Sequence, residues 1–475
     1  MSAETRETTV RMPAFQFSTL ALFAALTATA CSGGDSAAPV APPVLTSLTV
    51  SLAPTTVQVG QTSTATAAGR DQHGAAIATG AITWSSTAAQ VATISGSGTV
   101  QGVAPGQATV VASAGAVTGS ATITVTAVDP IAACRLPARF NGIGLGLPRD
   151  ADRQKAVGDV RIAVIFVDFS DAVATRTPQN VFAILSPTAE NYFRAVSYGR
   201  MNLILEPSFV WRRMSGATTQ YGWSALTHIN HRIYIQEAVD LAASVNFANS
   251  DAITVISNPD AGALNNGPTF IGNPTSGITA DGKLFMNATT SGRDLSAWGG
   301  FWLNHELGHS MGLPDLYAYS GAGHRFVGGF SLMGLIAGHS REFFAWERWV
   351  LGWIDDAQVS CAVAGTSEVV LSPVERSGGT KMVVIPTGLT SAVVVESRRA
   401  EGYDTNGAFS PGALVYFIDT AVGSGNGVLK VLPINDADGN KGSAPLQPGQ
   451  SISSGSVTIT YLSSDGGGDR IRVVR

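Results

Sequence analysis

The chain has 475 residues, enough for about two to four domains, and 45% of them are hydrophobic, which is ample for several cores. Only 13% are charged, the net charge is −5 and no basic run occurs, which argues against nucleic acid as a partner. The 53 glycines, with abundant Ala, Ser, Thr and Val, are more typical of exported β-rich modules than of a cytosolic enzyme.

Residues 1–31 have the features of an export signal. Two arginines precede an apolar run that ends at Ala30 and is too short to span a membrane as a mature helix. Small residues then lead to Cys31, as in a lipoprotein signal whose cysteine becomes the lipidated N-terminus. Met12 as the true start and ordinary signal-peptide cleavage stay open. We therefore expect an exported protein, either secreted or attached to the cell surface through a lipidated Cys31.

Residues 32–44, rich in Ser, Ala and Pro, predict a flexible linker. Residues 45–127 predict a separate small β-sandwich, because short alternating segments are broken regularly by Gly and Pro. The stretch ITWSSTAAQVATISGSGTVQGVAPGQATVVAS, with Trp84 as its predicted core anchor, resembles the bacterial immunoglobulin-like group 2 domain. The resemblance implies a spacer or adhesive module with no chemistry of its own.

Residues 128–360 have the mixture of strands and helices that predicts a mixed α/β domain. Residues 161–168 form a continuous apolar run, which suits a central strand covered on both faces. The other predicted elements before the metal motif are a helix over 178–195, a turn and a strand pair over 197–211, a helix over 232–247 and a strand over 251–257.

The pattern H-E-x-x-H-x-x-G-x-x-D begins at His305. Two His four residues apart on a helix lie on one face, so His305 and His309 can bind one metal ion. Gly312 can end the helix in a left-handed turn, after which Asp315 can arrive as the third ligand. Two imidazoles and one carboxylate suit Zn²⁺ with a position left for water, and Glu306 is placed to act on that water as general base. A metal-free helix is the alternative, but it would bury these polar groups at high cost.

Other side chains compete for roles at this site. Glu342 and Glu347 lie downstream, where thermolysin-like enzymes place a third ligand, although each fits a helix surface or a salt bridge better. His228 and His231 are three apart and more typical of surface residues. The candidates for steadying a substrate carbonyl are His324, His339, Tyr317 and Tyr319, with a solvated loop as the alternative for the two histidines.

The segment GGFSLMG, which ends at Gly334, resembles the Met-turn of metzincins, in which a methionine underlies the metal site. Met333 is the matching residue, and an ordinary core methionine is the alternative. Residues 342–354, EFFAWERWVLGWI, predict an amphipathic helix that packs beneath the site.

Several of these motifs together resemble the immune inhibitor A family of secreted bacterial metallopeptidases. They fall within residues 158–460 and are VIFVDFSD, YFRAVSYGRMNL, HELGHSMGLPDLY, SLMG, AWERWVLGWI, VVVESRRAEGYD, GALVYFID and DADGN. The resemblance implies a metzincin-like endopeptidase with one catalytic zinc, often with structural calcium. It implies that His305, His309 and Asp315 are the ligands and that Glu306 is the base.

Residues 361–475 contain short apolar segments separated by Gly, Ser and Pro, which predict a sandwich-like β-rich domain packed on the enzyme. Asp436, Asp438 and Asn440 alternate as in loops that wrap one calcium ion. Lys441 stands where such loops have Gly, and no Glu closes the loop, so a plain turn competes with a structural calcium site.

Cys134 and Cys361 flank the predicted catalytic segment, one just before it and one just after. In an oxidising compartment these two predict a disulfide that ties the ends of the domain together, and two unpaired buried thiols are the alternative.

The sequence therefore predicts a multidomain α+β protein with an Ig-like β-sandwich, a mixed α/β zinc-peptidase domain and a C-terminal β-sandwich-like domain. The predicted activity is that of a zinc metalloendopeptidase acting on extracellular proteins or peptides through a metal-activated water and Glu306. The alternative function is a surface adhesin or glycan-binding protein with a non-catalytic peptidase-like scaffold. The oligomeric state stays open.

Overall fold

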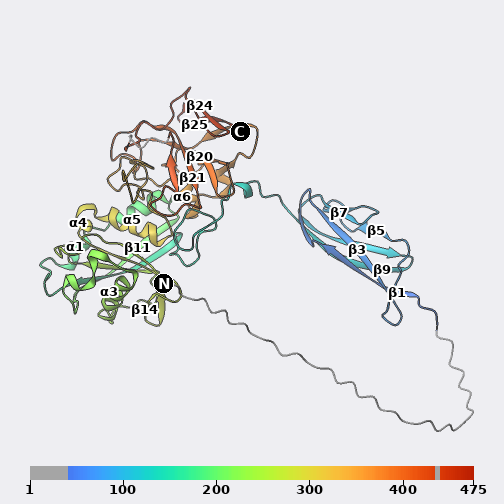
Figure 1. Cartoon of the computed structure of the whole chain (residues 1–475), viewed down its shortest axis with the longest axis horizontal. Coiled ribbons are helices and arrows are strands. Elements are labelled where there is room, and N and C mark those ends of the chain that lie inside the picture. Colours follow the sequence, from blue (N-terminus) through green and yellow to red (C-terminus); the bar gives the residue numbers. More distant parts are fainter. Residues whose placement is uncertain (1–40, 434–438) are drawn as a thin grey trace, which may run out of the picture. The chain divides into compact units, whose positions relative to one another are not determined.

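The computed structural model describes residues 41–433 and 439–475. Contacts divide the chain into two compact units, Met1–Val128 and Asp129–Arg475 (Figure 1). Each unit has hydrophobic cores of its own.

The first unit is a sandwich of two sheets. One sheet consists of β1 (Leu45–Ala53), β3 (Thr62–Asp71), β7 (Thr99–Gly102) and β6 (Ala92–Ile94), with β4 (Ala76–Ile77) beside β3. The other consists of β2 (Thr56–Gln58), β9 (Val117–Thr126), β8 (Gly106–Ala114) and β5 (Thr83–Ser86). Successive side chains of a strand point to opposite faces, so Val100, Val110 and Ile123 face inward and form the core. Trp84 is half-buried and packs against this core.

The second unit contains a five-stranded sheet. Its order is β11 (Met201–Arg213), β10 (Gly158–Asp168), β12 (Ala252–Ser257), β16 (Asn287–Thr290) and β13 (Thr269–Ile271). All neighbours are parallel except β13, which runs antiparallel to β16 at one edge of the sheet. The middle strands β10 and β12 are buried on both faces, which is why their sequences are apolar runs without alternation.

The prediction of a strand pair over 197–211 is wrong. The segment is the single strand β11, which pairs with β10 along its length with an irregular register between Val164 and Phe166. Pro207 has no N–H to donate, and Phe209 has a φ of 41°, so the bulged stretch has the composition of a turn without being one.

Helices cover both faces of this sheet (Figure 1). They are α1 (Pro178–Phe182), α2 (Thr188–Val196), α3 (His228–Asp240), α4 (Asp294–Trp298) and α5 (Gly300–Ser310). Residues of α2 and α5 share a core with Val164 and Phe166, whereas α3 packs with Ile165 on the opposite face. The single helix predicted over 178–195 is instead two helices, because Pro187 interrupts it.

Shorter elements complete this part of the chain. They are the 3-10 helices η1 (Ala132–Cys134), η2 (Thr218–Tyr221), η3 (Trp223–Ala225) and η4 (Asp356–Gln358), and a hairpin of β14 (Ile278–Ala280) and β15 (Lys283–Phe285).

The C-terminal strands form two further sheets. One has the order β17 (Val359–Cys361), β19 (Met382–Pro386), β20 (Ser391–Arg398), β21 (Gly412–Asp419) and β22 (Leu429–Val431). The other has the order β18 (Thr366–Leu371), β25 (Gly468–Val474), β24 (Val457–Asp465) and β23 (Ser451–Ser454). Val393 and Val395 pack in the core shared with the second of these sheets. Ala392 and Val394 pack on the other face, in the core that also contains α5.

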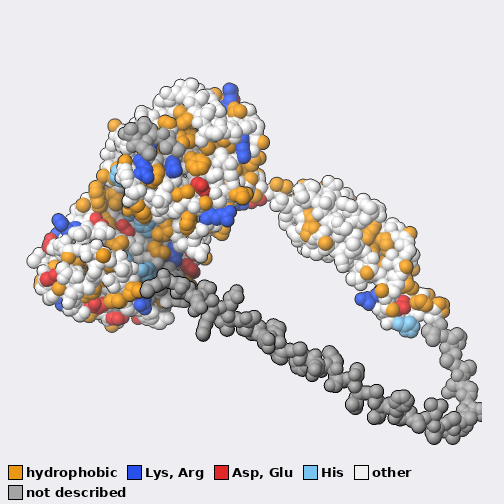
Figure 2. Space-filling model, viewed as in Figure 1, with side chains coloured by type: hydrophobic (Ala, Val, Ile, Leu, Met, Phe, Trp, Pro, Cys, Tyr) orange, Lys and Arg blue, Asp and Glu red, His pale blue; other side chains and the backbone are white. Residues whose placement is uncertain are grey.

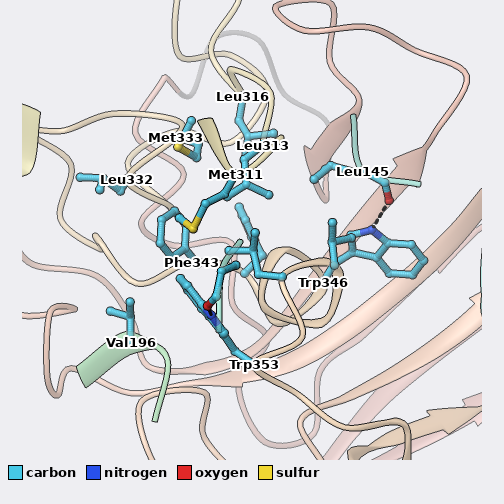
Figure 3. Packing of buried hydrophobic residues seen from close by; sticks show 14 of the residues in the cluster. Leu145, Val196, Met311, Leu313, Leu316, Leu332, Met333, Phe343, Trp346 and Trp353 are labelled. Atoms are coloured by element: carbon cyan, nitrogen blue, oxygen red, sulfur yellow. Dashed lines mark hydrogen bonds between the residues drawn. The ribbon is translucent and has the colours of Figure 1, made fainter. Parts of the chain in front are cut away.

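One large core therefore joins the five-stranded sheet to the C-terminal strands. It includes residues of β10, α2, α5, α6 (Ala345–Val350) and β19 to β22. Figure 3 shows Met311, Met333, Phe343 and Trp353 among its members, and the Trp346 indole N–H donates to the Leu145 carbonyl at 2.7 Å. Residues 129–475 are accordingly one compact unit.

The prediction of an amphipathic helix over 342–354 is wrong. The helix α6 has only 6 residues and every one of them is buried. Its two charged residues have partners inside the protein. Glu347 accepts from the Ser331 hydroxyl and the Phe344 N–H, both at 2.8 Å, and Arg348 pairs with Glu342. A buried helix can contain such residues only when they are paired.

The structure joins Cys134 to Cys361 by a disulfide across 227 residues of sequence. On the face drawn in Figure 2, charged side chains are scattered among uncharged ones, as the low charge content implies. Within the described ranges, no helix combines the length and apolarity that crossing a bilayer requires.

Replacing both cysteines, as Cys134→Ser with Cys361→Ser, should lower the free energy of unfolding by about 2–5 kcal/mol, because so long a closed loop restricts the unfolded chain. Guanidinium unfolding followed by tryptophan fluorescence measures the effect. Dithiothreitol should lower the unfolding midpoint of the wild type and leave the double variant unchanged. Equal midpoints with and without reductant in the wild type would contradict the structural role of this bond.

Candidate metal centre

Helix α5 presents two histidines to the same point. His305 and His309 lie one turn apart, and their ring centroids are 4.8 Å from each other. The Nδ1 atom of His305 lies 2.9 Å from the Leu332 carbonyl, and that of His309 lies 2.7 Å from the Leu313 carbonyl. A carbonyl can only accept a hydrogen bond, so Nδ1 holds the proton in the neutral ring. The unprotonated Nε2 then has a lone pair that can bind a metal ion.

Asp315 reaches this point because the chain reverses after α5. Gly312 has a φ of 99°, a conformation that side chains resist, and Leu313 closes the turn by donating to the Gly308 carbonyl at 2.9 Å. Asp315 Oδ1 then lies 3.2 Å from the Nε2 atoms of both His305 and His309.

His305, His309 and Asp315 are the one group of His, Cys, Asp and Glu in the described chain that could hold a metal ion, with ligand atoms within 4.8 Å of one another. All three are buried, between 6% and 9% exposed. Asp315 Oδ1 is buried and accepts no hydrogen bond from the described residues. Two imidazole Nε2 atoms and an unpartnered carboxylate oxygen, oriented from behind, fit the donor set that zinc prefers.

The electrostatics of the cluster call for a cation. Burial disfavours the charged imidazolium, but the adjacent Asp315 carboxylate outweighs it and raises the pKa of His309 to about 9. Burial also opposes ionisation of Asp315, yet the neighbouring histidines hold the pKa of that carboxyl well below its usual range. The carboxylate is thus kept ionised by positive charge facing it, and a divalent ion can replace the proton on His309.

Glu306 is next to His305, a candidate metal ligand, in sequence but has a different partner. The Thr269 hydroxyl of β13 lies 2.7 Å from both Glu306 Oε2 and the Glu306 backbone carbonyl, so its single proton is shared between these two acceptors. Within the described chain the other oxygen, Oε1, has no hydrogen-bond partner. Burial raises the pKa of Glu306, which favours proton uptake by this carboxylate.

Met333 lies directly beneath α5. A Cβ on Gly308 would come within 2.5 Å of the Met333 sulfur, so the glycine is what lets the two segments approach. The Met333 carbonyl accepts from the Leu316 N–H at 2.9 Å, and its neighbour Leu332 orients His305. The turn therefore supports one ligand directly and the chain leading from another.

A cleft of about 300 Å³ opens beside His305 and Glu306. Its other lining residues include Trp298, Trp302, Tyr317, His324, Leu335 and Ile336. Tyr317 stacks on the His305 ring with centroids 6.4 Å apart. Burial raises the pKa of Tyr317, so its phenol stays protonated and can donate a hydrogen bond.

The competing ligands lie elsewhere. Glu342 pairs with Arg348 and accepts from the Tyr403 N–H at 3.0 Å, and Glu347 accepts from the Ser331 hydroxyl in the turn before Met333. Neither belongs to the group of metal-competent residues in the described chain.

The candidates for carbonyl stabilisation divide into two pairs. Tyr317 and His324 line the cleft. His339 stacks on Phe409, with centroids 5.3 Å apart, and Tyr319 donates its hydroxyl to Asp315 Oδ2 at 2.6 Å.

His228 and His231 lie outside the group of three described residues that could hold a metal ion. The Thr290 hydroxyl donates to the Pro268 carbonyl at 2.9 Å and so can only accept from His231 Nε2, which lies 2.9 Å away. His228 stacks on Phe270 with centroids 4.7 Å apart. His231 is thus buried rather than a surface residue, contrary to prediction.

Two predicted sites fall partly or wholly outside the described residues. Cys31, the predicted lipidation site, lies there, as do Asp436 and Asp438 of the predicted calcium loop. Asn440, the remaining residue of that loop, accepts through its backbone carbonyl from the Gly329 N–H at 3.0 Å.

Sequence reasoning missed the residues that orient this site. Thr269, which fixes Glu306, lies on an edge strand of only 3 residues with no motif of its own. Ser424, whose hydroxyl accepts from the Asp315 N–H at 2.9 Å, is 109 residues away from its partner in sequence. Neither has a local pattern that predicts the contact.

Comparison with known proteins assigns one part of the chain. Residues 44–125 match the bacterial Ig-like domain (group 2), and this segment is a member of that family. Such a domain is consistent with a cell-surface or exported protein. No curated protein matches the chain.

Among solved structures, similarity is found to the S-layer protein SbsC. Its domains 5–6 are 29% identical over 19% of this chain and 47% of that one, with a TM-score of 0.17. Domains 4–9 are 31% identical over 19% and 15%, with a TM-score of 0.16, and domains 4 and 5 are 30% identical over 18% and 54%, with a TM-score of 0.15. The chain thus spans about half or less of these structures.

Gly308→Ala should destabilise the second unit although it improves helix propensity. The propensity gain is about 1 kcal/mol, whereas forcing a methyl group against the Met333 sulfur costs about 1–3 kcal/mol. Thermal unfolding should show a lower Tm, and Gly308→Ala combined with Met333→Ala should lower it by less than the two single variants together, because Met333→Ala removes the clash. Gly262→Ala, where a Cβ meets nothing within 4 Å, is the matched control. A raised Tm for Gly308→Ala would contradict the close packing.

His231 should make the second unit less stable in acid. Burial, with a contribution from His228, lowers its pKa to about 3, below the value of about 6.5 expected in the unfolded chain. Between these values the unfolded chain binds the extra proton, so stability is complete above pH 6.5 and falls as pH decreases toward 3. Lowering the pH from 7 to 5 should cost about 2 kcal/mol through this group. Urea unfolding at both pH values should show a smaller pH dependence in His231→Gln; an identical dependence would contradict the assignment.

Proposed function

We propose that the chain is a zinc-dependent endopeptidase that hydrolyses peptide bonds in extracellular proteins. The observation that supports this most is the convergence of His305 Nε2, His309 Nε2 and Asp315 Oδ1, with the Glu306 carboxylate left outside the ligand set. The immune inhibitor A resemblance of the sequence supports the same activity.

The chemistry divides between the metal and the chain. When bound by His305, His309 and Asp315, zinc would polarise a carbonyl and make water more acidic. Glu306 takes the proton from the attacking water and returns it to the leaving amine, and its raised pKa suits both transfers. Thr269 keeps the carboxylate in one orientation while this occurs. Tyr317 is the best placed donor for a developing oxyanion, because it lines the cleft and keeps its proton.

An extended peptide has a natural binding place along β13. This strand is at one edge of the sheet. The Pro268 carbonyl accepts from the Thr290 N–H, and the Gly272 N–H donates to the Met286 carbonyl, so both groups point toward β16. Backbone groups alternate in direction along a strand, so those of Thr269 and Ile271 point away from β16, where the Ile271 carbonyl lies 3.2 Å from His228 Nε2. A substrate strand paired there would pass Glu306, with the cleft of Trp298, Leu335 and Ile336 accepting an apolar side chain.

The remaining parts of the chain fit this activity outside the cytoplasm. Lipidation of Cys31 would attach the enzyme to a membrane, and the Ig-like domain would then act as a spacer. The predicted calcium site at Asp436, Asp438 and Asn440 would be structural.

A second candidate function is a surface adhesin or glycan-binding protein that uses the second unit as a scaffold. The observation that favours it is the family match, which falls on the Ig-like domain and on no peptidase family. A scaffold has no need for an oriented Glu306, so the state of that residue separates the two candidates.

Glu306→Gln should abolish proteolysis without loss of metal. We expect cleavage of casein to fall by about 10²–10⁴-fold, because the amide cannot take up the proton. The variant should retain one equivalent of zinc by elemental analysis, since Glu306 is not a ligand. Wild-type activity should be lost with a chelator and recovered with zinc.

Glu368→Gln is the control, because Glu368 is exposed and pairs with Arg472 at 2.8 Å, away from the site. Full activity in Glu306→Gln would overturn its role as base. Stoichiometric zinc without any proteolysis in the wild type would favour the scaffold function.

A further inference from the structure

The loop that contains Asp315 is held by a turn from the C-terminal strands. The turn lies between β21 and β22, which pair antiparallel with Ile418 opposite Leu429. Ser424 and Gly425, within this turn, make the contacts to the Asp315 loop. Asp315 thus lies within the loop that the Cys134–Cys361 disulfide closes, whereas the turn that supports it lies beyond Cys361 in sequence.

Backbone contacts fix the position of the Asp315 loop. The Asp315 N–H donates to Ser424 Oγ at 2.9 Å, and the Asp315 carbonyl accepts from the Gly425 N–H at 3.1 Å. The Gly425 carbonyl in turn accepts from the Tyr319 N–H at 3.1 Å. Both backbone groups of the third ligand are therefore used by two consecutive residues of the turn.

The hydroxyl groups of Tyr319 and Ser424 fix the Asp315 carboxylate itself. Tyr319 donates its hydroxyl proton to Asp315 Oδ2 at 2.6 Å, and its oxygen lies 2.9 Å from Ser424 Oγ. Because the phenol has only one proton, Ser424 must be the donor in the second bond. Oδ2 is thereby occupied, and Oδ1, which faces both Nε2 atoms, is left without a hydrogen bond.

Gly425 is required by the same arrangement. Its φ is +71°, and a Cβ at this position would lie 2.3 Å from ring atoms of Tyr319. The tyrosine ring lies across the turn, which places its hydroxyl between Ser424 and the carboxylate. Tyr319 is 58% exposed, so its position is determined by these contacts rather than by burial.

We propose that Ser424, Gly425 and Tyr319 are positioning residues that set the third metal ligand, which makes the C-terminal strands part of the metal centre. The inference rests on the proposed zinc function. It also assigns Tyr319 a role different from carbonyl stabilisation, because its hydroxyl proton is given to a metal ligand. Partners that orient a ligand in this way typically contribute about 10–100-fold to metal affinity.

The test measures zinc affinity by competition with a chromophoric chelator in the full chain. Ser424→Ala and Tyr319→Phe should each raise the zinc Kd by about 10–100-fold. Ser424→Thr, which keeps the hydroxyl, should restore most of the affinity. The visible spectrum of the cobalt-substituted protein should change in both weakened variants, since the geometry of a ligand changes.

Ser453→Ala is the matched control, because Ser453 makes a similar hydroxyl contact to Thr458 at 2.9 Å within β23 and β24. It should leave zinc affinity unchanged. Tyr319→Phe removes a single oxygen from an exposed residue, so the variant should fold, with a metal-free Tm only slightly below that of the wild type because Asp315 Oδ2 loses one hydrogen bond. This variant keeps the test valid if Ser424→Ala fails to fold.

Three outcomes would overturn parts of the proposal. Unchanged zinc Kd in both variants, with zinc bound to the wild type, would overturn the positioning role alone. An unchanged Kd and spectrum with a reduced kcat in Tyr319→Phe would make Tyr319 a catalytic residue instead. A wild-type chain without stoichiometric zinc would overturn the proposed function and this inference with it.

Discussion

The second unit depends on the burial of one ionised carboxylate opposite two imidazole rings. Isolated charge is costly in a protein interior, and Asp315 Oδ1 has no hydrogen-bond donor in the described chain to offset that cost. Positive charge must therefore face it, either as a proton on His309 or as a divalent ion. The arrangement stays intact because each of the three side chains is held from behind, by Leu332, Leu313 and Tyr319.

The rest of the unit explains how such a cluster stays rigid. Helix α5 lies in a core that includes both the five-stranded sheet and the strands β19 to β22. Strands covered on both faces, such as β10 and β20, have runs of apolar side chains, and the core that contains their inward residues continues from one set of strands to the other. Residues predicted as two domains, 128–360 and 361–475, accordingly form one compact unit.

Local patterns predicted the local parts of this structure. The apolar run at 161–168 indicates a central strand because burial on both faces leaves no alternation. The helix repeat determines the spacing of His305 and His309. The turn that follows requires the positive φ of Gly312. Some patterns were compatible with two structures, as in the bulged strand β11 and the buried helix α6. In these segments contacts with residues distant in sequence determine the structure, and no local pattern indicates those contacts.

The supporting contacts of the site could not be predicted for a similar reason. Thr269 and Ser424 meet Glu306 and Asp315 only because a sheet edge and a turn are brought there by the fold. Single Thr and Ser residues have no periodicity or spacing that indicates a partner.

The bond between Cys134 and Cys361 has a consequence for any proteolytic nick in the chain between them. It closes a covalent ring that contains His305, Glu306, His309 and Asp315. A nick anywhere on that ring opens it without releasing a fragment, because the two pieces remain attached through the cystine. Molecules nicked once in this ring would keep their apparent mass on a non-reducing gel and separate into two pieces only after the disulfide is reduced.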